Sequence, residues 1–182
     1  YVILGLVIAV VFFVFFLSKM PQSKDDGQLP SVRETIKVLI KNSNYFLGLN
    51  SQIFHVGCLI MCWTFIYQYA EVIGIDSVAA GNYQLTAFVL FVIGRALGTY
   101  LLRFISAGKQ LFYYSLLGII FLFGVVFIQG IYGLYCLVAV SFCLSVKFPT
   151  IYGIALGDLS EQEAKIGSAG LIMAIVGGAT LP

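Results

Sequence analysis

Six long apolar stretches, separated by polar connections, dominate this 182-residue sequence. A stretch of roughly 20 residues, at about 1.5 Å of rise per residue, crosses the hydrocarbon core of a bilayer, which is ~30 Å thick. Inside lipid, a helix satisfies its own backbone hydrogen bonds without water. The sequence therefore predicts an all-α, polytopic transmembrane helix bundle with about six spans. The six apolar stretches cover residues 1–17, 45–69, 80–102, 110–129, 132–157 and 166–182.

Composition supports a lipid environment. Hydrophobic residues make up 60% of the chain and charged residues 10%, whereas soluble domains have roughly 45–50% apolar and about 25% charged residues. Such a chain cannot cover its own surface with polar groups, so we expect the lipid bilayer to be its main partner. The sequence shows no nucleophile–base pair, phosphate-binding glycine loop, metal cluster or nucleic-acid patch. We therefore predict no enzyme activity, cofactor, metal or nucleic-acid partner.

The basic residues of the connections predict the orientation of the spans. All eight loop cations lie in alternate connections, and the other two connections contain only the charges of Glu71 and Asp76. Because Lys and Arg accumulate in cytoplasmic loops, we place the cation-bearing connections in the cytoplasm. We expect an integral protein of the bacterial inner (plasma) membrane. The eight cations are Lys19, Lys24, Arg33, Lys37, Lys41, Arg103, Lys109 and Lys165.

The first connection is the longest. Residues 20–30 are typical of a flexible polar linker, and Ser31 with Glu34 fits a helix-capping box. Apolar residues follow at helical spacing from Val32 to Ile40. Two interpretations remain open: a short amphipathic helix on the inner membrane surface, or the first turns of the next span.

The cysteines and the single histidine are interpreted as packing residues. All four cysteines lie in apolar stretches, so we expect free thiols rather than a disulfide framework. His55 precedes Cys58 and Cys62 on one helix face, but a structural metal site would need further ligands.

Two other ionisable residues lie within spans, where charge is expensive and usually functional. Arg95, between Gly94 and Gly98, is predicted to act as a conformational latch; the alternative is a side chain that reaches the inner head groups. Lys147 lies deeper and next to Pro149, which disturbs the helix. It is predicted to bind an anionic substrate group or to pair with a carboxylate; the alternative is a structural ion pair.

Aromatic and amide side chains suggest a wall that binds a polar substrate. Sugars are bound by amide hydrogen bonds together with an aromatic face, and such groups gather in the outer parts of the second and third stretches. The competing interpretation is an aromatic belt at the membrane interface. On the fifth stretch, Phe148 and Tyr152 share a helical stripe with two serines, whereas Lys147 lies off that stripe. The candidate wall residues are Trp63, Tyr67, Gln68, Asn82, Gln84, Phe148 and Tyr152.

Several motifs, in order along the chain, resemble the fucose–proton symporters of the major facilitator superfamily. Residues 61–65 (Met-Cys-Trp-Thr-Phe) are similar to the seventh helix of that family, and 94–99 (Gly-Arg-Ala-Leu-Gly-Thr) to the end of its eighth. Residues 148–153 (Phe-Pro-Thr-Ile-Tyr-Gly) are similar to its tenth helix, and 165–178 to its eleventh. The resemblance implies helices six to eleven of a twelve-helix fold.

The resemblance also implies domains and a function. Residues 1–17 would end the N-terminal bundle, 18–44 would form the cytoplasmic interdomain loop, and 45–182 the C-terminal bundle. Both ends of the chain would then be cuts through transmembrane helices, and the N-terminal half would be a missing partner. The implied activity is proton-coupled uptake of a monosaccharide, L-fucose or a related hexose, by alternating access. Trp63 and Phe148 match positions that approach the sugar in that family.

Two observations keep alternatives open. Lys147 stands where the family has an uncharged residue, so a carrier of organic anions or acidic sugars is the second hypothesis. No acidic residue lies deep within a span, so we expect the proton-binding carboxylates outside this sequence. A non-transporting membrane scaffold is the third hypothesis.

Overall fold

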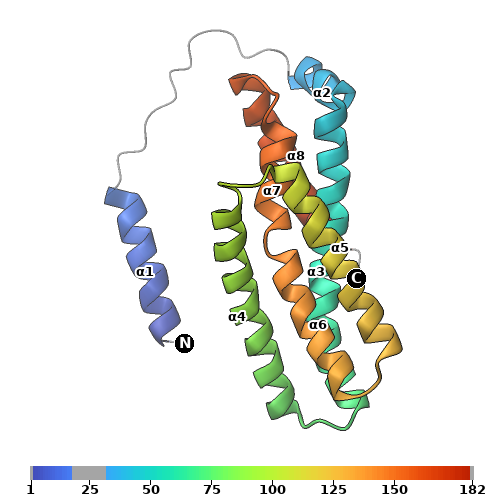
Figure 1. The fold of residues 1–182 in the computed structure, drawn as a ribbon. Coiled ribbons are helices and arrows are strands. Elements are labelled where there is room, and N and C mark those ends of the chain that lie inside the picture. Colours follow the sequence, from blue (N-terminus) through green and yellow to red (C-terminus); the bar gives the residue numbers. More distant parts are fainter. Residues whose placement is uncertain (1, 18–31, 181–182) are drawn as a thin grey trace.

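The computed structural model describes residues 2–17 and 32–180, and within these ranges every regular element is an α-helix. The predicted all-α class is therefore confirmed (Figure 1). The helices are α1 (Val2–Leu17), α2 (Val32–Lys41), α3 (Ser43–Val72), α4 (Ser77–Leu101), α5 (Ala107–Phe127), α6 (Ile131–Leu144), α7 (Lys147–Leu156) and α8 (Glu161–Ala179).

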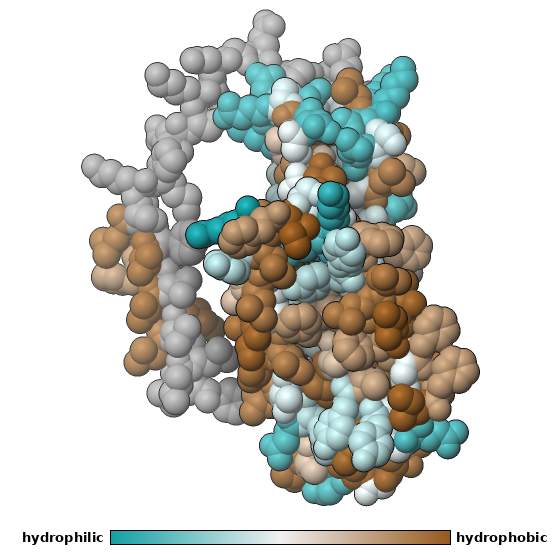
Figure 2. All heavy atoms as spheres, in the orientation of Figure 1, coloured by the Kyte–Doolittle hydropathy of each residue, from teal (hydrophilic) through white to brown (hydrophobic). Residues whose placement is uncertain are grey.

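Four spans in the described residues are long and apolar enough to cross a membrane: α3, α4, α5, and α6 together with α7. The first stretch forms α1, which has 16 residues, and the last forms α8, which begins with a polar turn. These two stay predicted spans. Hydrophilic residues gather at the two ends of the molecule and hydrophobic ones predominate between them (Figure 2), as expected for a bundle in lipid.

The helices α3 to α8 form an up-and-down bundle in which α6 occupies the centre. It packs on α5, α4 and α3, while α7 and α8 pack on the inner half of α3. The connections that follow α4 and α7 lie at the same end as α2, and those that follow α3 and α5 lie at the other end (Figure 1). This arrangement matches the sides assigned from the basic residues.

The amphipathic segment before α3 is a separate helix. The backbone of Asn42 is extended, and its side-chain oxygen accepts hydrogen bonds from the backbone N–H groups of Asn44 and Tyr45 at 3.0 and 3.2 Å. This N-cap ends α2 and starts α3. Leu39 of α2 is buried where this helix packs on α3 and α8, so α2 is not the first turns of the next span. Its position on the inner membrane surface stays a prediction. The linker, and the Ser31 and Glu34 side chains of the capping box, lie outside what the structure describes.

The central span breaks one turn before Pro149. Proline has no N–H and its ring crowds the carbonyl four residues earlier, which here belongs to Ser145. The helix accordingly ends at Leu144 and restarts at Lys147, so Pro149 lies in the first turn of α7, where proline is tolerated. Thr150 Oγ1 donates to the Val146 carbonyl at 2.8 Å and satisfies part of the backbone that the break exposes.

The α4 helix packs closely on this break. A Cβ atom added to Gly94 would lie 2.5 Å from Ser145 Oγ, and one added to Gly98 would overlap the Val146 side chain. The Gly98 carbonyl also accepts a 2.7 Å hydrogen bond from Gln110 Nε2, which ties α4 to α5. A neighbouring backbone comes close at Gly94, where the Phe142 carbonyl oxygen would lie 2.8 Å from the added Cβ, whereas the contacts at Gly98 are with side chains.

Candidate functional site

An open cleft between the outer parts of α3 and α4 brings together four of the predicted wall residues. Its volume is about 550 Å³. Two of these four side chains are aromatic and two are amides, and this combination suits a polar ligand with apolar C–H faces. The lining residues are Ile60, Trp63, Thr64, Tyr67, Gln68, Gln84 and Phe88.

Trp63 is held in place by two phenylalanines of α4. Its ring lies 4.8 Å from that of Phe88 and 5.5 Å from that of Phe91, both edge to face. Such pairs stabilise by about 0.5–1.5 kcal/mol beyond the area they bury. The indole is therefore fixed on the α3–α4 wall and only half-buried, which leaves part of it to contact a ligand in the cleft.

Two polar atoms of this wall have no hydrogen-bond partner among the described residues. They are Trp63 Nε1, a donor, and Gln84 Oε1, an acceptor, and both are buried. A buried polar atom without a partner costs about 1–3 kcal/mol. A hydroxyl group both donates and accepts, so one hydroxyl-rich ligand can satisfy both kinds of atom once movement of these side chains exposes them to the cleft.

The remaining predicted wall residues lie elsewhere. Asn82 is exposed on α4 and does not line the cleft. Phe148 and Tyr152 stack on each other on α7, with ring centroids 6.4 Å apart, and neither lines the α3–α4 cleft. Ser145 of the same stripe packs against α4, whereas Tyr152 packs on a cluster that includes Tyr45 of α3 and Leu171 of α8, so the break separates the two parts of the stripe.

Lys147 faces the other side of the bundle. It lines a pocket of about 410 Å³ between α3, α5 and α7, together with Asn50, Ser51, His55 and Ser115 among others. Lys147 therefore faces neighbouring helices, as its position off the Phe148–Tyr152 stripe indicated. The structure therefore separates Lys147 from Trp63, although the sequence placed them in one candidate site.

Gly94 and Arg95, the residues of the predicted conformational latch, have different surroundings. Gly94 is buried in the α4–α6 crossing, whereas the side chain of Arg95 is exposed, and the described residues offer it no carboxylate partner. His55 is buried, and its Nδ1 atom has no partner among the described residues. All four cysteines are free thiols, as expected. Among residues 2–17 and 32–180, no three His, Cys, Asp or Glu side chains form a group suited to a metal ion.

Sequence reasoning missed three residues that line the cleft: Ile60, Thr64 and Phe88. Helical spacing was the signal that would have found them. Phe88 lies four residues after Gln84, Ile60 lies three residues before Trp63, and Thr64 lies four residues before Gln68, so each shares a helix face with a predicted residue.

Comparison with known proteins gives a consistent set of relatives, although no family model matches. The chain is 42% identical over 184 residues to the L-fucose-proton symporter of Haemophilus influenzae, covering 100% of this chain and 42% of that protein. It is 28% identical to the L-fucose-proton symporter of Escherichia coli K12, covering 98% and 42%. A putative glucose/galactose transporter of Helicobacter pylori is 28% identical, covering 93% and 41%.

Solved structures agree. A crystal structure of the E. coli fucose:proton symporter, FucP, superposes with a TM-score of 0.86 at 28% identity, covering 99% of this chain and 46% of that one. A second, described as a major facilitator superfamily transporter in the outward conformation, gives the same TM-score and covers 45% of its chain. The chain thus spans less than half the length of the relatives it matches.

Proposed function

Because the chain belongs to the fucose–proton symporter family of the major facilitator superfamily, we propose that it forms one wall of the sugar site in a proton-coupled monosaccharide transporter. It is an integral membrane protein of the bacterial inner membrane, and its relatives are transporters rather than enzymes. The proposed substrate is L-fucose or a related hexose.

The observation that carries this proposal is the α3–α4 cleft. It combines a fixed indole with unpartnered donor and acceptor atoms and has no charged residue in its lining. A neutral sugar offers apolar C–H faces to the indole and hydroxyl groups to the amides of Gln68 and Gln84. The cleft lies open on the bundle surface, so the opposite wall comes from outside the described helices.

The break in the central span supports alternating access. Interrupted helices in transporters mark places where backbone lines a cavity or where a bundle flexes. Here the break at Ser145–Val146 packs directly on Gly94 and Gly98 of α4. We propose that this crossing transmits movement of α7 to α4, and that the exposed Arg95 beside it latches a facing carboxylate in one conformation. Phe148 and Tyr152 move with α7 and would join the sugar site as the bundles rock.

Proton coupling needs a titrating group within the membrane. All eight acidic residues of this sequence lie outside its apolar stretches. We therefore propose that the coupling carboxylates belong to segments beyond these residues. Lys147 takes no part in the neutral-sugar wall, because it lines a pocket between α3, α5 and α7. An acidic-sugar carrier would require a charged lining in the cleft, and the cleft has none.

The test is uptake of labelled L-fucose, D-galactose and D-glucose by the natural protein in its own membrane, with the external pH recorded. Uptake of one sugar with alkalinisation outside is expected. Gln84→Leu should raise KM about tenfold or more, because sugar hydroxyls lose a buried partner. Trp63→Phe should weaken binding less than Trp63→Ala, since it keeps an aromatic face. As a matched amide control, Gln129→Leu lies in the exposed connection before α6 and should leave KM unchanged.

Acidic sugars taken up in preference to neutral ones would overturn the neutral-sugar proposal. Unchanged kinetics in both Gln84→Leu and Trp63→Ala would instead remove the cleft from the site. Sugar uptake without a pH change would exclude the proton coupling while leaving the wall intact.

A further inference from the structure

One face of α3 carries a regular row of side chains, most of which are exposed on the surface of the bundle. The row is spaced alternately by four residues and three, which is the spacing of the seam between two left-handed, knobs-into-holes helices. It extends over about 27 Å at ~1.5 Å per residue, close to the full hydrocarbon thickness of a membrane. Its members, with large and small side chains alternating over the first five, are Leu47, Ser51, Phe54, Cys58, Met61 and Phe65.

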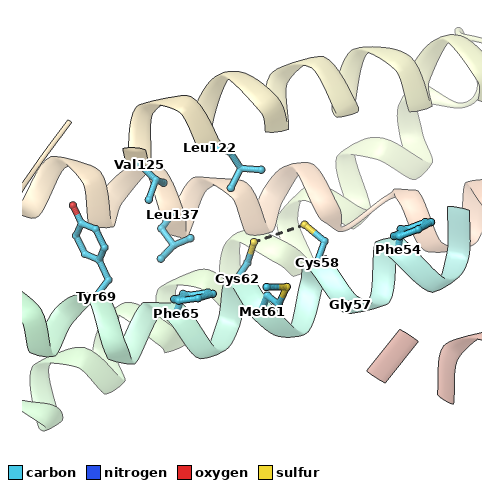
Figure 3. Close-up of a pocket in the computed structure, with 10 residues that line it drawn as sticks. All are labelled: Phe54, Gly57, Cys58, Met61, Cys62, Phe65, Tyr69, Leu122, Val125 and Leu137. Carbon is cyan, nitrogen blue, oxygen red and sulfur yellow. Dashed lines mark hydrogen bonds between the residues drawn. The ribbon is translucent and has the colours of Figure 1, made fainter. Parts of the chain in front are cut away.

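These side chains stand out from the bundle. Leu47, Phe54 and Met61 are 61%, 70% and 42% exposed. Three adjoining pockets follow the row along α3, and neighbouring pockets share lining residues, so they form one continuous groove. Figure 3 shows its outer part, where Phe54, Met61 and Phe65 extend from α3 and the Cys58 and Cys62 sulfur atoms lie 4.0 Å apart.

The groove has two walls and a floor. The walls are α3 and α5, which both pack on α6 and α7 but do not pack closely on each other. The α5 wall presents Leu111, Ser115 and Leu122, again spaced by four and seven residues. The floor is formed by residues of α6 and α7. A single helix laid between α3 and α5 would complete the packing of both walls.

The floor carries one charge. Lys147 lies nine residues before the end of α7, about 14 Å of helical rise, and is half-buried. Among the described residues no carboxylate lies within ion-pair distance of it. A charge at this depth requires a partner. Helix α1 has no acidic residue, and in a second copy of the chain every acidic residue would lie outside the apolar stretches as well, Glu71 being at the far end of α3 from Lys147.

We propose that this groove binds one further transmembrane helix, and that this helix carries an Asp or Glu side chain that pairs with Lys147. The helix comes from a polypeptide segment other than residues 1–182, since all eight acidic residues of this sequence lie outside its apolar stretches. The matched relatives are more than twice as long as this chain, so they contain further segments of that kind. The proposal stands independently of the sugar site, which lies on the α3–α4 side.

Photo-crosslinking in the native membrane tests the proposal. A p-benzoyl-phenylalanine residue replaces Met61 in the groove. The matched control is the same replacement at Ile120 of α5, which is 57% exposed and lies about 200° around the helix from the buried Gly118. Met61→p-benzoyl-phenylalanine is expected to yield a peptide adduct from an apolar helix with an acidic residue near its middle. The Ile120 variant is expected to yield lipid adducts. Lipid adducts at both positions, or an adduct to a second copy of this chain, would overturn the proposal.

The charge pairing is tested on the captured helix. Lys147→Met should lower the yield of the Met61 adduct by about tenfold, because it leaves a buried carboxylate unpaired. Lys147→Arg should keep the yield within about twofold, since it keeps the positive charge. Replacing the acidic residue of the captured helix by its amide in the Lys147→Met background should restore the yield, because no unpaired charge remains. A captured helix without an acidic residue, or a yield indifferent to Lys147→Met, would remove the ion pair from the proposal.

Discussion

Replacing Gly94 with alanine would place a methyl group in the crossing between α4 and the break of the central span. The added Cβ would lie 2.5 Å from Ser145 Oγ, 2.8 Å from the Phe142 carbonyl oxygen and 2.9 Å from the Phe142 ring. The hydroxyl could rotate away, but it donates a 2.7 Å hydrogen bond to that same carbonyl. The carbonyl belongs to the last turns of α6 and cannot move without moving the backbone.

The magnitude follows from two opposing effects. Overpacking of a well-filled crossing costs about 1–3 kcal/mol. Alanine in a helix interior recovers roughly 0.5–1 kcal/mol over glycine. We expect Gly94→Ala to lower the free energy of unfolding by about 1–2 kcal/mol, a factor of roughly 5–30 in the ratio of folded to unfolded protein.

The assay is denaturant unfolding of the purified protein in detergent micelles, with Gly153→Ala as the matched control. An added Cβ at Gly153 of α7 meets nothing within 4 Å, so this control should stabilise by about 0.4–1 kcal/mol. Ser145→Ala removes the nearest clashing atom, so Gly94→Ala should cost less in that background. Equal, stabilising effects of Gly94→Ala and Gly153→Ala would refute the close crossing.

Two further predictions concern a buried hydrogen bond and the hydrogen-bonded cap of a helix. The hydroxyl of Tyr45 donates a buried 3.1 Å hydrogen bond to the Gly167 carbonyl, so Tyr45→Phe should lower the free energy of unfolding by about 1 kcal/mol. The control Tyr113→Phe changes an exposed side chain and should alter stability little. Equal effects of the two substitutions in the denaturant assay would contradict this prediction. At the start of α8, hydrogen bonds from the Ser160 hydroxyl and backbone N–H hold the pKa of the Glu163 carboxyl below its usual value. Because the folded pKa is the lower one, the capping box should contribute fully above the ordinary carboxyl pKa of about 4.3 and lose its contribution as pH falls through the lowered value. The protection of first-turn amides of α8 against hydrogen exchange, measured relative to the intrinsic exchange rate at each pH, should therefore fall in acid. Glu163→Gln should abolish that pH dependence, and protection that does not change with pH in the unmodified protein would contradict the prediction.

Much of the fold was predictable because each signal is local in the sequence. The lengths of the apolar stretches predicted four spans within a few residues, and the basic residues predicted which connections lie at the same end of the bundle (Figure 1). The assignment of that end to the cytoplasm stays a prediction. Pro149 predicted an interrupted helix, but the interruption lies one turn earlier, because the clash is with the carbonyl of Ser145. The order of motifs gave the family, since it depends on residue identity alone.

The site was predictable only in part. Trp63, Tyr67, Gln68 and Gln84 meet in one cleft, as expected from their neighbouring stretches. Lys147 was predicted to bind substrate because it is a charge deep within a span and lies next to Pro149. Depth says nothing about direction, and the break before α7 fixes the angle at which Lys147 leaves the helix.

The sequence by itself determined that this chain crosses a membrane repeatedly, which connections share one end of the bundle and which family it belongs to. Only the tertiary structure decided which helix faces meet: glycines of α4 against the break, Trp63 against two phenylalanines, and a row on α3 left open beside Lys147. The physical reason lies in the solvent. In lipid, residues that face the bilayer and residues that face another helix are both apolar, so hydrophobic periodicity does not distinguish them. The fit of side chains between neighbouring helices then selects the pairing, and that fit depends on residues far apart in the sequence.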